Sequence, residues 1–372
     1  MWSNSLGKRF VITAFGESHG AVMGTVIDGC PAGLELTEDD IQSELDRRHP
    51  GQSEITTPRK ELDQVRILSG MLNSRTTGAP ICAKVQNTNV NSSFYEIIKD
   101  KPRPGHADYV TKIKYGNFAD QRGGGRFTGR ITIAYAIAGA IAKKLLKEIL
   151  NVEIFAHTVQ IGTKKATKLS LDYIKENREK TSTRCADLEA SREMVEHIKK
   201  AAGERDSCGG IIECIAENLP IGLGEPVLDT LEGDLAKAMF AIPAVRAIEF
   251  GAGFKAAIMY GSEHNDELFL DKTRIVSKTN YSGGIIGGIS TGMPIVFRLA
   301  IKPTSTIGKP QRTVDLKQMK PTIIEGLGRH DPCIVPRAVP IVESMTAIVL
   351  ADHALRAGVI PPVLERFTNA RT

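Results

Sequence analysis

Short segments rich in apolar residues recur along the chain, and clusters of glycine separate them. Such segments predict strands, because the glycines mark tight turns and close backbone approaches between them. The expected strands span residues 11–15, 22–28, 64–68, 81–86, 153–161, 209–216, 256–260 and 295–301. They do not alternate regularly with helices, and no G-x-G-x-x-G pattern follows the first strand. The pattern therefore favours a mixed α+β fold with large antiparallel sheets over a Rossmann domain.

Other segments have the apolar spacing or the small-residue content of helices. One begins at Thr37, a good N-cap residue, and carries three acidic residues in its first turn. Another starts apolar and becomes amphipathic at Lys143, so it should start buried and end at the surface. The expected helices span residues 37–45, 131–149, 194–202, 228–240 and 338–355, and the last is apolar enough to be buried.

The chain of 372 residues is long enough for two or three average domains or one large one. No low-complexity linker divides it. The stretch most like a linker, residues 162–192, is rich in Lys, Thr and Ser, and we interpret it as a surface excursion that contains a helix. We therefore expect one domain over residues 1–372.

Composition excludes several classes of protein. The net charge of +5 is small for this length, and the basic residues are not interleaved with aromatics, which argues against a nucleic-acid partner. The six cysteines include no C-x-x-C pair, so neither a metal site nor a disulfide scaffold is expected. No apolar signal segment opens the chain, and residues 131–142 are too few to span a bilayer. We expect a soluble cytoplasmic protein that does not contact membranes.

Two distant motifs look like halves of one active site. GESHG (16–20) places a histidine beside glycine, where few side chains crowd it. RGGGRFTGR (122–130) surrounds three glycines with arginines, and bare backbone N–H groups beside guanidinium groups suit an anion such as phosphate. Acid/base chemistry next to an anion site indicates an enzyme that acts on a phosphorylated molecule.

Two histidines are the candidate acid/base groups. His19 has Ser18 and Glu17 beside it, which could fix its tautomer and pKa. His106 lies in RPGHADY (103–109), where proline and glycine fix the loop and an arginine and an aspartate bracket the imidazole. Each histidine could instead have a purely structural role.

Weaker motifs supply further cations and glycines. DRRHPGQ (46–52) ends a helix, so its arginines could either cap that helix or clamp an anion together with the basic residues of 58–60. SGGIIGG (282–288) and KPTST (302–306) would suit a phosphate or a ring edge. GRHDPC (328–333) adds a carboxylate that could relay protons.

Taken together, the motifs resemble those of the chorismate synthase family. The runs are FGESHG, DRRHPGQS, RPGHADY, RGGGRF, GLGEP, IPAV, GGIIGGIS, KPTST and GRHDPC-x-x-x-RAVP, in the family's order over nearly the whole chain. The resemblance implies a large β-α-β sandwich and a homotetramer. It also implies a lyase that removes phosphate and a proton from 5-enolpyruvylshikimate 3-phosphate by anti-1,4 elimination, with reduced FMN as cofactor.

The resemblance also assigns roles to residues. His106 would protonate or stabilise the reduced flavin, His19 would act near the leaving phosphate, and Ser18 and Asp331 would form a proton relay. The implied flavin contacts are Arg126, Phe127, Thr128, Pro243, Ala244, Gly287, Lys302, Pro303, Thr304, Ser305, Thr306 and Arg329. The implied substrate contacts are Arg48, Arg59, Arg130 and Arg337, and no metal site is implied.

Four positions depart from the family pattern. His49, Glu54, Leu62 and Ile131 stand where many members carry Arg, a basic residue, Pro and Glu. The acid at 54 removes the basis for placing NADPH there, so NADPH would act as an indirect reductant, with a separate flavin reductase as a possible partner. Two other functions stay open from the sequence: a flavoprotein that oxidises a phosphorylated molecule, and a non-enzymatic anion- or RNA-binding module.

Overall fold

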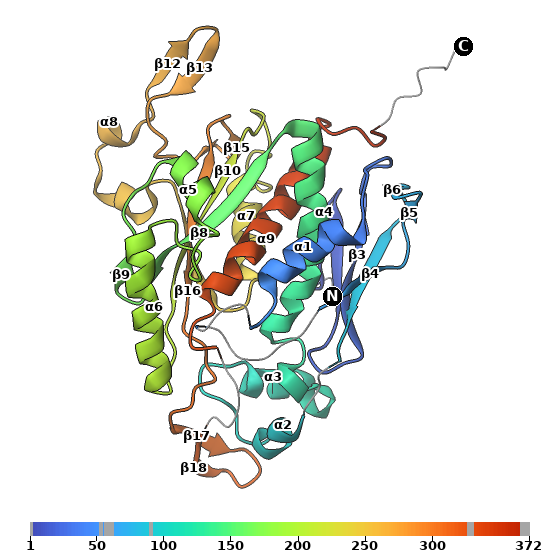
Figure 1. Cartoon of the computed structure of the whole chain (residues 1–372), viewed down its shortest axis with the longest axis vertical. Coiled ribbons are helices and arrows are strands. Elements are labelled where there is room, and N and C mark those ends of the chain that lie inside the picture. Colours follow the sequence, from blue (N-terminus) through green and yellow to red (C-terminus); the bar gives the residue numbers. More distant parts are fainter. Residues whose placement is uncertain (1–2, 52–54, 56–62, 89–91, 326–330, 365–372) are drawn as a thin grey trace.

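Two five-stranded antiparallel sheets lie on either side of a layer of helices in the computed structural model (Figure 1). The structure describes all residues except 1–2, 52–54, 56–62, 89–91, 326–330 and 365–372. The first sheet has the order β1 (Ser5–Leu6), β2 (Val11–Gly16), β3 (Val22–Asp28), β7 (Ile81–Gln86) and β4 (Val65–Ile67). The second has the order β11 (Val245–Phe250), β16 (Ile295–Ile301), β10 (Gly210–Glu217), β8 (Glu153–Ile161) and β9 (Lys164–Lys165). This arrangement confirms the expected α+β sandwich.

Helices α4 (Thr132–Leu150) and α9 (Val335–Arg356) fill the centre of the sandwich. The two helices cross closely because Gly139 faces Ser344, and a Cβ at position 139 would come within 2.2 Å of the serine Cβ. Among the described residues, α9 alone is long and apolar enough to cross a membrane, and almost all of it is buried inside the protein. It is therefore the core helix that its sequence predicts.

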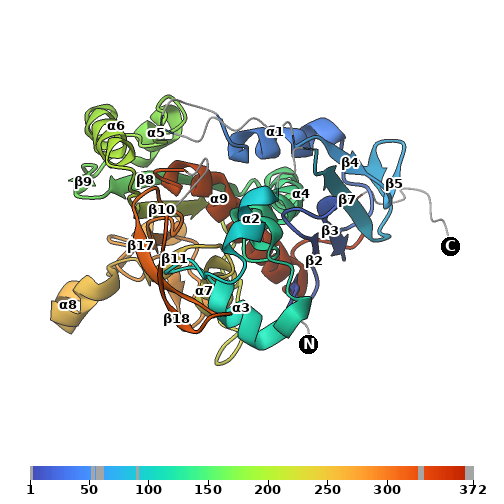
Figure 2. The same cartoon turned by 90° about the horizontal axis from the view of Figure 1, so that it is seen from below.

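The remaining elements surround this core. The other helices are α1 (Glu38–Arg48), α2 (Ser93–Ile98), α3 (Asp108–Tyr115), α5 (Leu171–Asn177), α6 (Leu188–Gly203), α7 (Leu231–Phe240) and α8 (Gly261–His264). Four small hairpins are β5 (Met71–Leu72) with β6 (Arg75–Thr76), β12 (Leu268–Asp271) with β13 (Arg274–Ser277), β14 (Ile285–Ile286) with β15 (Ile289–Ser290), and β17 (Gln311–Asp315) with β18 (Lys320–Ile324). The hairpin β12–β13 projects from the body (Figure 1), and α5 and α6 lie outside β8 and β9 (Figure 2).

Most expected elements form where the local signals place them. Helix α1 begins with a capping box, in which the Thr37 hydroxyl accepts from the Asp40 amide and the Asp40 carboxylate accepts from the Thr37 amide. Helix α7 begins at Leu231 rather than 228, because the Thr230 hydroxyl accepts from the Gly233 amide and sets the first turn there.

The strand expected at 256–260 is wrong. Residues Gly253–Ile258 form a 3₁₀ turn, and Ile258 is 82% exposed. Gly253 has a φ of +58°, and the Phe254 amide donates to the Glu249 carboxylate, so the backbone curls away from the sheet. The strand that pairs with β16 is instead β11, just upstream.

The start of the chain is fastened to its last helix. The carboxylate of Asp352, on α9, accepts hydrogen bonds from the backbone amides of Lys8, Arg9 and Phe10, at 2.7, 2.5 and 2.9 Å. Phe10 is fully buried directly before β2. The first sheet is therefore tied to a residue more than 340 positions away in the sequence.

Candidate active site

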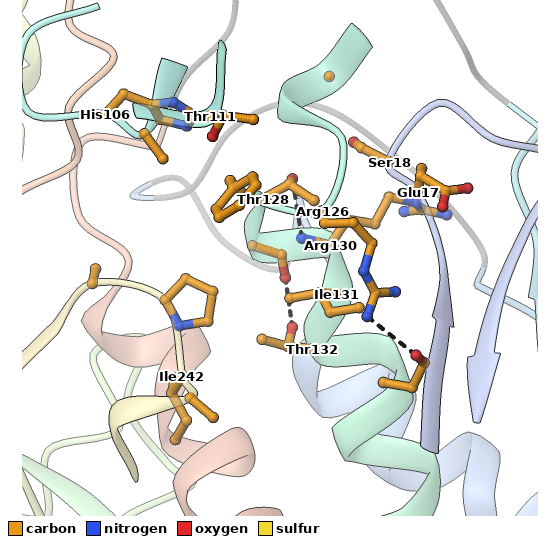
Figure 3. A pocket seen from close by; sticks show the side chains of 18 of the residues that line it. Glu17, Ser18, His106, Thr111, Arg126, Thr128, Arg130, Ile131, Thr132 and Ile242 are labelled. Atoms are coloured by element: carbon orange, nitrogen blue, oxygen red, sulfur yellow. Dashed lines mark hydrogen bonds between the residues drawn. The ribbon is translucent and has the colours of Figure 1, made fainter. Parts of the chain in front are cut away.

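A large cavity opens between the two sheets, at the N-terminal ends of α4 and α9 (Figure 3). Its volume is about 1600 Å³, which exceeds the roughly 300–1,000 Å³ typical of a pocket for one small ligand. The candidate residues that line it are Ser18, Arg48, His106, Arg126, Phe127, Thr128, Arg130, Pro243, Ala244, Lys302, Thr304, Ser305, Thr306, Asp331 and Arg337. Candidates from seven separate stretches of sequence thus share one cavity.

Five candidates are not in that lining. His19 lies just behind it, as described below, and Pro303 lies between two lining residues. Arg59 and Arg329 lie outside the described residues. Gly287 lies in the β14–β15 turn, beside the first residue of α7, because the Leu231 amide donates to the Gly288 carbonyl. The lining residues 241–244 follow the last residue of α7, which lies about 15 Å along the helix from its first residue. Gly287 is therefore at the end of α7 away from the cavity lining, which does not fit the flavin contact expected for it.

The two glycine-containing motifs meet at Gly123. This residue has a φ of +61°, and a Cβ on it would lie 2.4 Å from Cδ2 of His19 and 2.5 Å from Oγ of Ser18. The Ser18 amide also donates to the Gly125 carbonyl at 3.0 Å. Only a residue without a side chain lets the second motif approach the Ser-His pair this closely.

His19 is held by groups that the sequence analysis did not identify. Its Nδ1 lies 2.8 Å from Oγ of Ser92, and its ring packs edge-on against Tyr95. The imidazole is 7% exposed. A hydrogen bond at Nδ1 determines which ring nitrogen carries the proton, so Ser92 influences the tautomer of His19.

His106 is oriented by a carboxylate, as the motif predicts. Its Nδ1 lies 2.6 Å from Oδ1 of Asp108, and the same carboxylate accepts from Nε of Arg103 at 2.8 Å. Burial opposes ionisation of Asp108, but hydrogen bonds from Arg103 and His106 hold its pKa well below the usual value. An ionised carboxylate at Nδ1 favours the tautomer that presents Nε2 as the basic atom.

Two further motifs are joined to the loop that carries His106. The Ser305 hydroxyl donates to the Gly105 carbonyl at 2.6 Å, and Nη1 of Arg103 donates to Oγ1 of Thr306 at 3.0 Å. The Thr304 hydroxyl donates to the Asp331 carbonyl at 3.1 Å. Residues 302–306 therefore connect the His106 loop to the segment that carries Asp331.

Two of the candidate substrate arginines share one buried carboxylate. Asp63 accepts from Nη1 of Arg48 at 2.7 Å and from Nη2 of Arg130 at 2.9 Å, and its side chain is 1% exposed. Burial lowers the pKa of Arg48 to about 10, with Asp63 opposing the shift, so Arg48 is charged at neutral pH. Its side chain lines the cavity and donates to Asp63, Thr132 and the Gly129 carbonyl, none of which belongs to α1, which argues against a helix-capping role.

Asn87 links Arg130 to the first motif. Its Oδ1 accepts from Nε of Arg130 at 2.7 Å, and its Nδ2 donates to the carbonyls of Glu17 and Gly20. Asn87 and Asp63 were not among the predicted site residues, because neither lies in a recognisable pattern and both act through contacts distant in sequence.

The two arginines that flank the three glycines were expected to face an anion, but both bind protein groups. Arg126 donates to the backbone carbonyls of Gly16 and Ala14 and to the Asn4 amide oxygen. Arg122 pairs with Asp120 at the surface. Arg126 therefore lines the cavity while joining its own motif to β2, and the cations directed at the cavity come mainly from other segments.

The lining of the cavity combines charged and apolar side chains. Among its described lining residues, seven are Lys or Arg and three are acidic. Arg337 forms an ion pair with Asp331, one of those acids. The lining also includes the apolar residues Ile131, Ile242, Pro243, Ile334, Ala338 and Ile341. Such a cavity suits an anion beside a flat apolar ring system.

Known proteins share this sequence and fold. The family model described as chorismate synthase matches residues 10–355. The chain belongs to the chorismate synthase family. It is 54% identical to the chorismate synthase of Dehalococcoides mccartyi over 98% of this chain and 100% of the relative, and 52% identical to that of Methanosarcina barkeri over 97% and 99%. A solved structure described as the crystal structure of chorismate synthase matches with a TM-score of 0.74, at 30% identity, over 94% of this chain and 93% of the other.

Membership in the chorismate synthase family makes this protein an enzyme, a lyase of the shikimate pathway that leads to aromatic amino acids. Two of its departures from the chorismate synthase pattern are visible in the structure. Ile131 is one of the apolar residues that line the cavity. Nδ1 of His49 lies 2.5 Å from the Asp46 carbonyl at the end of α1. Glu54 and Leu62 lie outside the described residues.

His106→Asn is expected to lower kcat by about 10²-fold, which is typical of losing one general acid or base. The side chain keeps a polar group near Asp108 but has no proton to exchange near neutral pH. Steady-state phosphate release measures the effect, and circular dichroism checks the fold. Turnover within about threefold of the unmodified enzyme would contradict an acid/base role, since proton transfer typically contributes far more.

Proposed function

We propose that the protein converts 5-enolpyruvylshikimate 3-phosphate to chorismate and phosphate by an anti-1,4 elimination, with reduced FMN bound. The observation that carries the proposal is one cavity that holds both candidate histidine loops and three arginines, Arg48, Arg130 and Arg337. The substrate has a phosphate and two carboxylates. A site that removes these groups from water must meet their charges with cations.

The cavity also fits the proposed flavin. Its apolar lining residues suit a flat ring system, and its volume leaves room for a second ligand. Residues 126–128, 243–244 and 302–306 would hold the flavin beside the His106 loop. Bound reduced FMN would supply the electron density that makes a weakly acidic C–H bond breakable without net oxidation.

Each polar group has a distinct role in this proposal. His106, oriented by Asp108, would hold a proton beside the cofactor, and His19 would supply positive charge or a proton where phosphate leaves. Ser18 and Asp331 would form a proton relay at the flavin, in which Asp331 would accept a proton passed to it through Ser18. Arg337, which pairs with Asp331, would hold that carboxylate in position.

The decisive experiment measures phosphate release from 5-enolpyruvylshikimate 3-phosphate under anaerobic conditions, with and without reduced FMN. We expect many turnovers with reduced FMN and none without it. NADPH is a second readout, because a lyase uses no stoichiometric reductant whereas a net-redox flavoprotein does. Stoichiometric NADPH consumption, or no phosphate release, would contradict the proposal.

Arg48→Lys is expected to raise KM for the phosphorylated substrate by about 10–100-fold, with a smaller change in kcat. The lysine loses the hydrogen bonds that hold the guanidinium in place, so its charge no longer meets the substrate in a fixed position. Arg48 uses three donors, toward Asp63, Thr132 and the Gly129 carbonyl. A lysine ammonium keeps the charge but cannot reproduce this planar set of contacts. An unchanged KM together with a lower Tm would show that Arg48 serves the fold only.

We also propose that the enzyme is a cytoplasmic homotetramer, supplied with reduced flavin by a separate reductase that uses NADPH. The support for assembly is apolar surface away from the cavity. In the projecting hairpin β12–β13, the side chains of Leu268, Leu270 and Ile275 are 69%, 73% and 66% exposed. Exposed apolar patches of this kind commonly mark subunit contacts. Sedimentation analysis tests the assembly.

A further inference from the structure

Residues 162–192, expected to be a surface excursion, reach the layer directly behind the active site through Arg184. This residue is 8% exposed and has a φ of +52°. Its carbonyl accepts from the Thr158 amide of β8 at 2.9 Å, and its amide donates to the Thr181 carbonyl at 3.0 Å. The left-handed backbone is thus fixed on both sides, which directs the side chain inward.

The guanidinium of Arg184 joins two segments that carry arginines of the cavity. Its Nη2 donates to the Arg47 carbonyl at 2.6 Å, and its Nη1 donates to the Pro336 carbonyl at 2.6 Å. Each carbonyl belongs to the residue directly before a cavity arginine, Arg48 or Arg337. Glu179 accepts from Nε of Arg184 at 3.1 Å and orients the guanidinium plane.

The carbonyl at the α9 end lacks its usual helical donor. In an α-helix, the carbonyl of residue 336 would accept from the amide of residue 340, but residue 340 is proline and has no N–H. The position is buried, where an unsatisfied carbonyl would be costly. Arg184 supplies the donor that Pro340 cannot.

The carbonyl at the α1 end lies in the last turn of that helix, where carbonyls lack helical partners. The Leu45 carbonyl accepts from the His49 amide, and the Arg48 carbonyl accepts from Nε of Arg337 at 3.4 Å. Arg184 satisfies the Arg47 carbonyl between them. The end of α1 and the start of α9 are therefore connected both directly and through Arg184.

This connection holds two like charges near each other. Burial is the main cause of the lowered pKa of Arg48, and the positive charge of Arg337 lowers it further. Two guanidinium groups that repel each other would move apart if their backbones were free. A rigid link between the two backbones keeps both groups ready for one polyanionic ligand.

We propose that Arg184 is a positioning residue, which bridges the carbonyls of Arg47 and Pro336 and so fixes the spacing of Arg48 and Arg337 in the substrate site. Arg184 does not line the cavity, so it acts only through the two backbones. The inference rests on the proposed function for the identity of the anion, but the bridge itself does not.

The test uses Arg184→Met and Arg184→Lys in the full chain, each with and without Pro340→Ala. Arg184→Met is expected to raise KM for the phosphorylated substrate about 10-fold or more, with kcat changed less, as for a weakened charged hydrogen bond. Arg184→Lys has one ammonium for two carbonyls and should show a smaller rise. Pro340→Ala returns an amide to the Pro336 carbonyl, so it should recover part of the loss.

Hydrogen exchange gives a readout independent of activity. Amides in residues 44–50 and 336–346 should exchange faster in Arg184→Met, and Pro340→Ala should slow the second set. Arg192→Met, an exposed change in the same excursion, is the matched control and should alter neither KM nor exchange.

The outcomes distinguish the bridge between the two carbonyls from its role in positioning Arg48 and Arg337. Unchanged exchange in both segments would overturn the bridge, and faster exchange with an unchanged KM would overturn the positioning role. If Arg184→Met does not fold, the same criteria apply to Arg184→Lys. If the unmodified enzyme releases no phosphate, the proposed function fails, and exchange alone decides whether the bridge exists.

Discussion

Glu343→Gln is expected to lower the free energy of unfolding by about 3–5 kcal/mol, the usual cost of leaving buried charges uncompensated. Glu343 is fully buried at the centre of α9, where its carboxylate accepts from Arg47, Lys143 and Arg178. It also accepts from the Ala156 amide at 3.0 Å. One side chain thus connects α1, α4, β8 and the end of α5 to the core helix, and glutamine would leave three cations facing a neutral amide.

The effect should depend on pH in a defined direction. Burial opposes ionisation of Glu343, but Lys143 and Arg47 hold its pKa well below 4.5. A lowered pKa in the folded state stabilises the fold above pH 4.5, and the contribution declines as the pH falls below that value. The difference between Glu343→Gln and the unmodified protein should therefore shrink in acid.

Denaturant unfolding at pH 7 and pH 4 provides the measurement, and Glu193→Gln is the control. Glu193 pairs with Lys164 at the surface, with side chains 54% and 42% exposed, so its loss should cost at most about 1 kcal/mol. If both substitutions lower the free energy of unfolding by the same amount at pH 7, the buried ion pairs of Glu343 stabilise the fold no more than a surface ion pair does.

Gly123→Ala is expected to reduce kcat by about 10²–10³-fold, because displacement of catalytic groups by around 1 Å costs this much. A Cβ at this position would lie 2.6 Å from Nε2 of His19 and 2.5 Å from Oγ of Ser18, so both side chains must move. The φ of +61° adds backbone strain. Steady-state kinetics should show the loss at saturating substrate.

Gly358→Ala is the control for Gly123→Ala, because it introduces the backbone strain of a positive φ without a steric contact. Gly358 has a φ of +71°, but a Cβ there meets nothing within 4 Å, and the residue follows α9 outside the cavity. This control should cost about 1 kcal/mol of stability or slightly more and should leave kcat unchanged. Equal losses of activity in both variants would refute the steric explanation.

The sequence predicted best where the signal is local. The capping residues of α1 and the apolar start of α4 depend on neighbours in sequence, and both helices form where they were expected. The error at 256–260 has the opposite cause, since an apolar run becomes a strand only where a partner strand can bury it. At this edge of the sheet β11 already occupies that place beside β16.

The same distinction applies to the site. The meeting of Ser18, His19 and Gly123 was predicted, because each motif has an unusual local composition. Asp63 and Asn87 were missed, because a lone acid or amide has no pattern and acquires its role only when the chain folds. The proposed catalytic steps stay predictions, and the structure supplies the contacts on which they depend.

The link between Asp352 and the amides of residues 8–10 has a consequence for how the chain folds during its synthesis. The ribosome adds about 5–20 residues per second, so α9 is complete roughly 13–54 s after the first sheet. Until then α4, β8 and β10 lack the core helix that packs against them, and the apolar side chains that face it stay exposed. The nascent chain without α9 is therefore the stage most open to aggregation, and a chain that stops before α9 should not reach the native state.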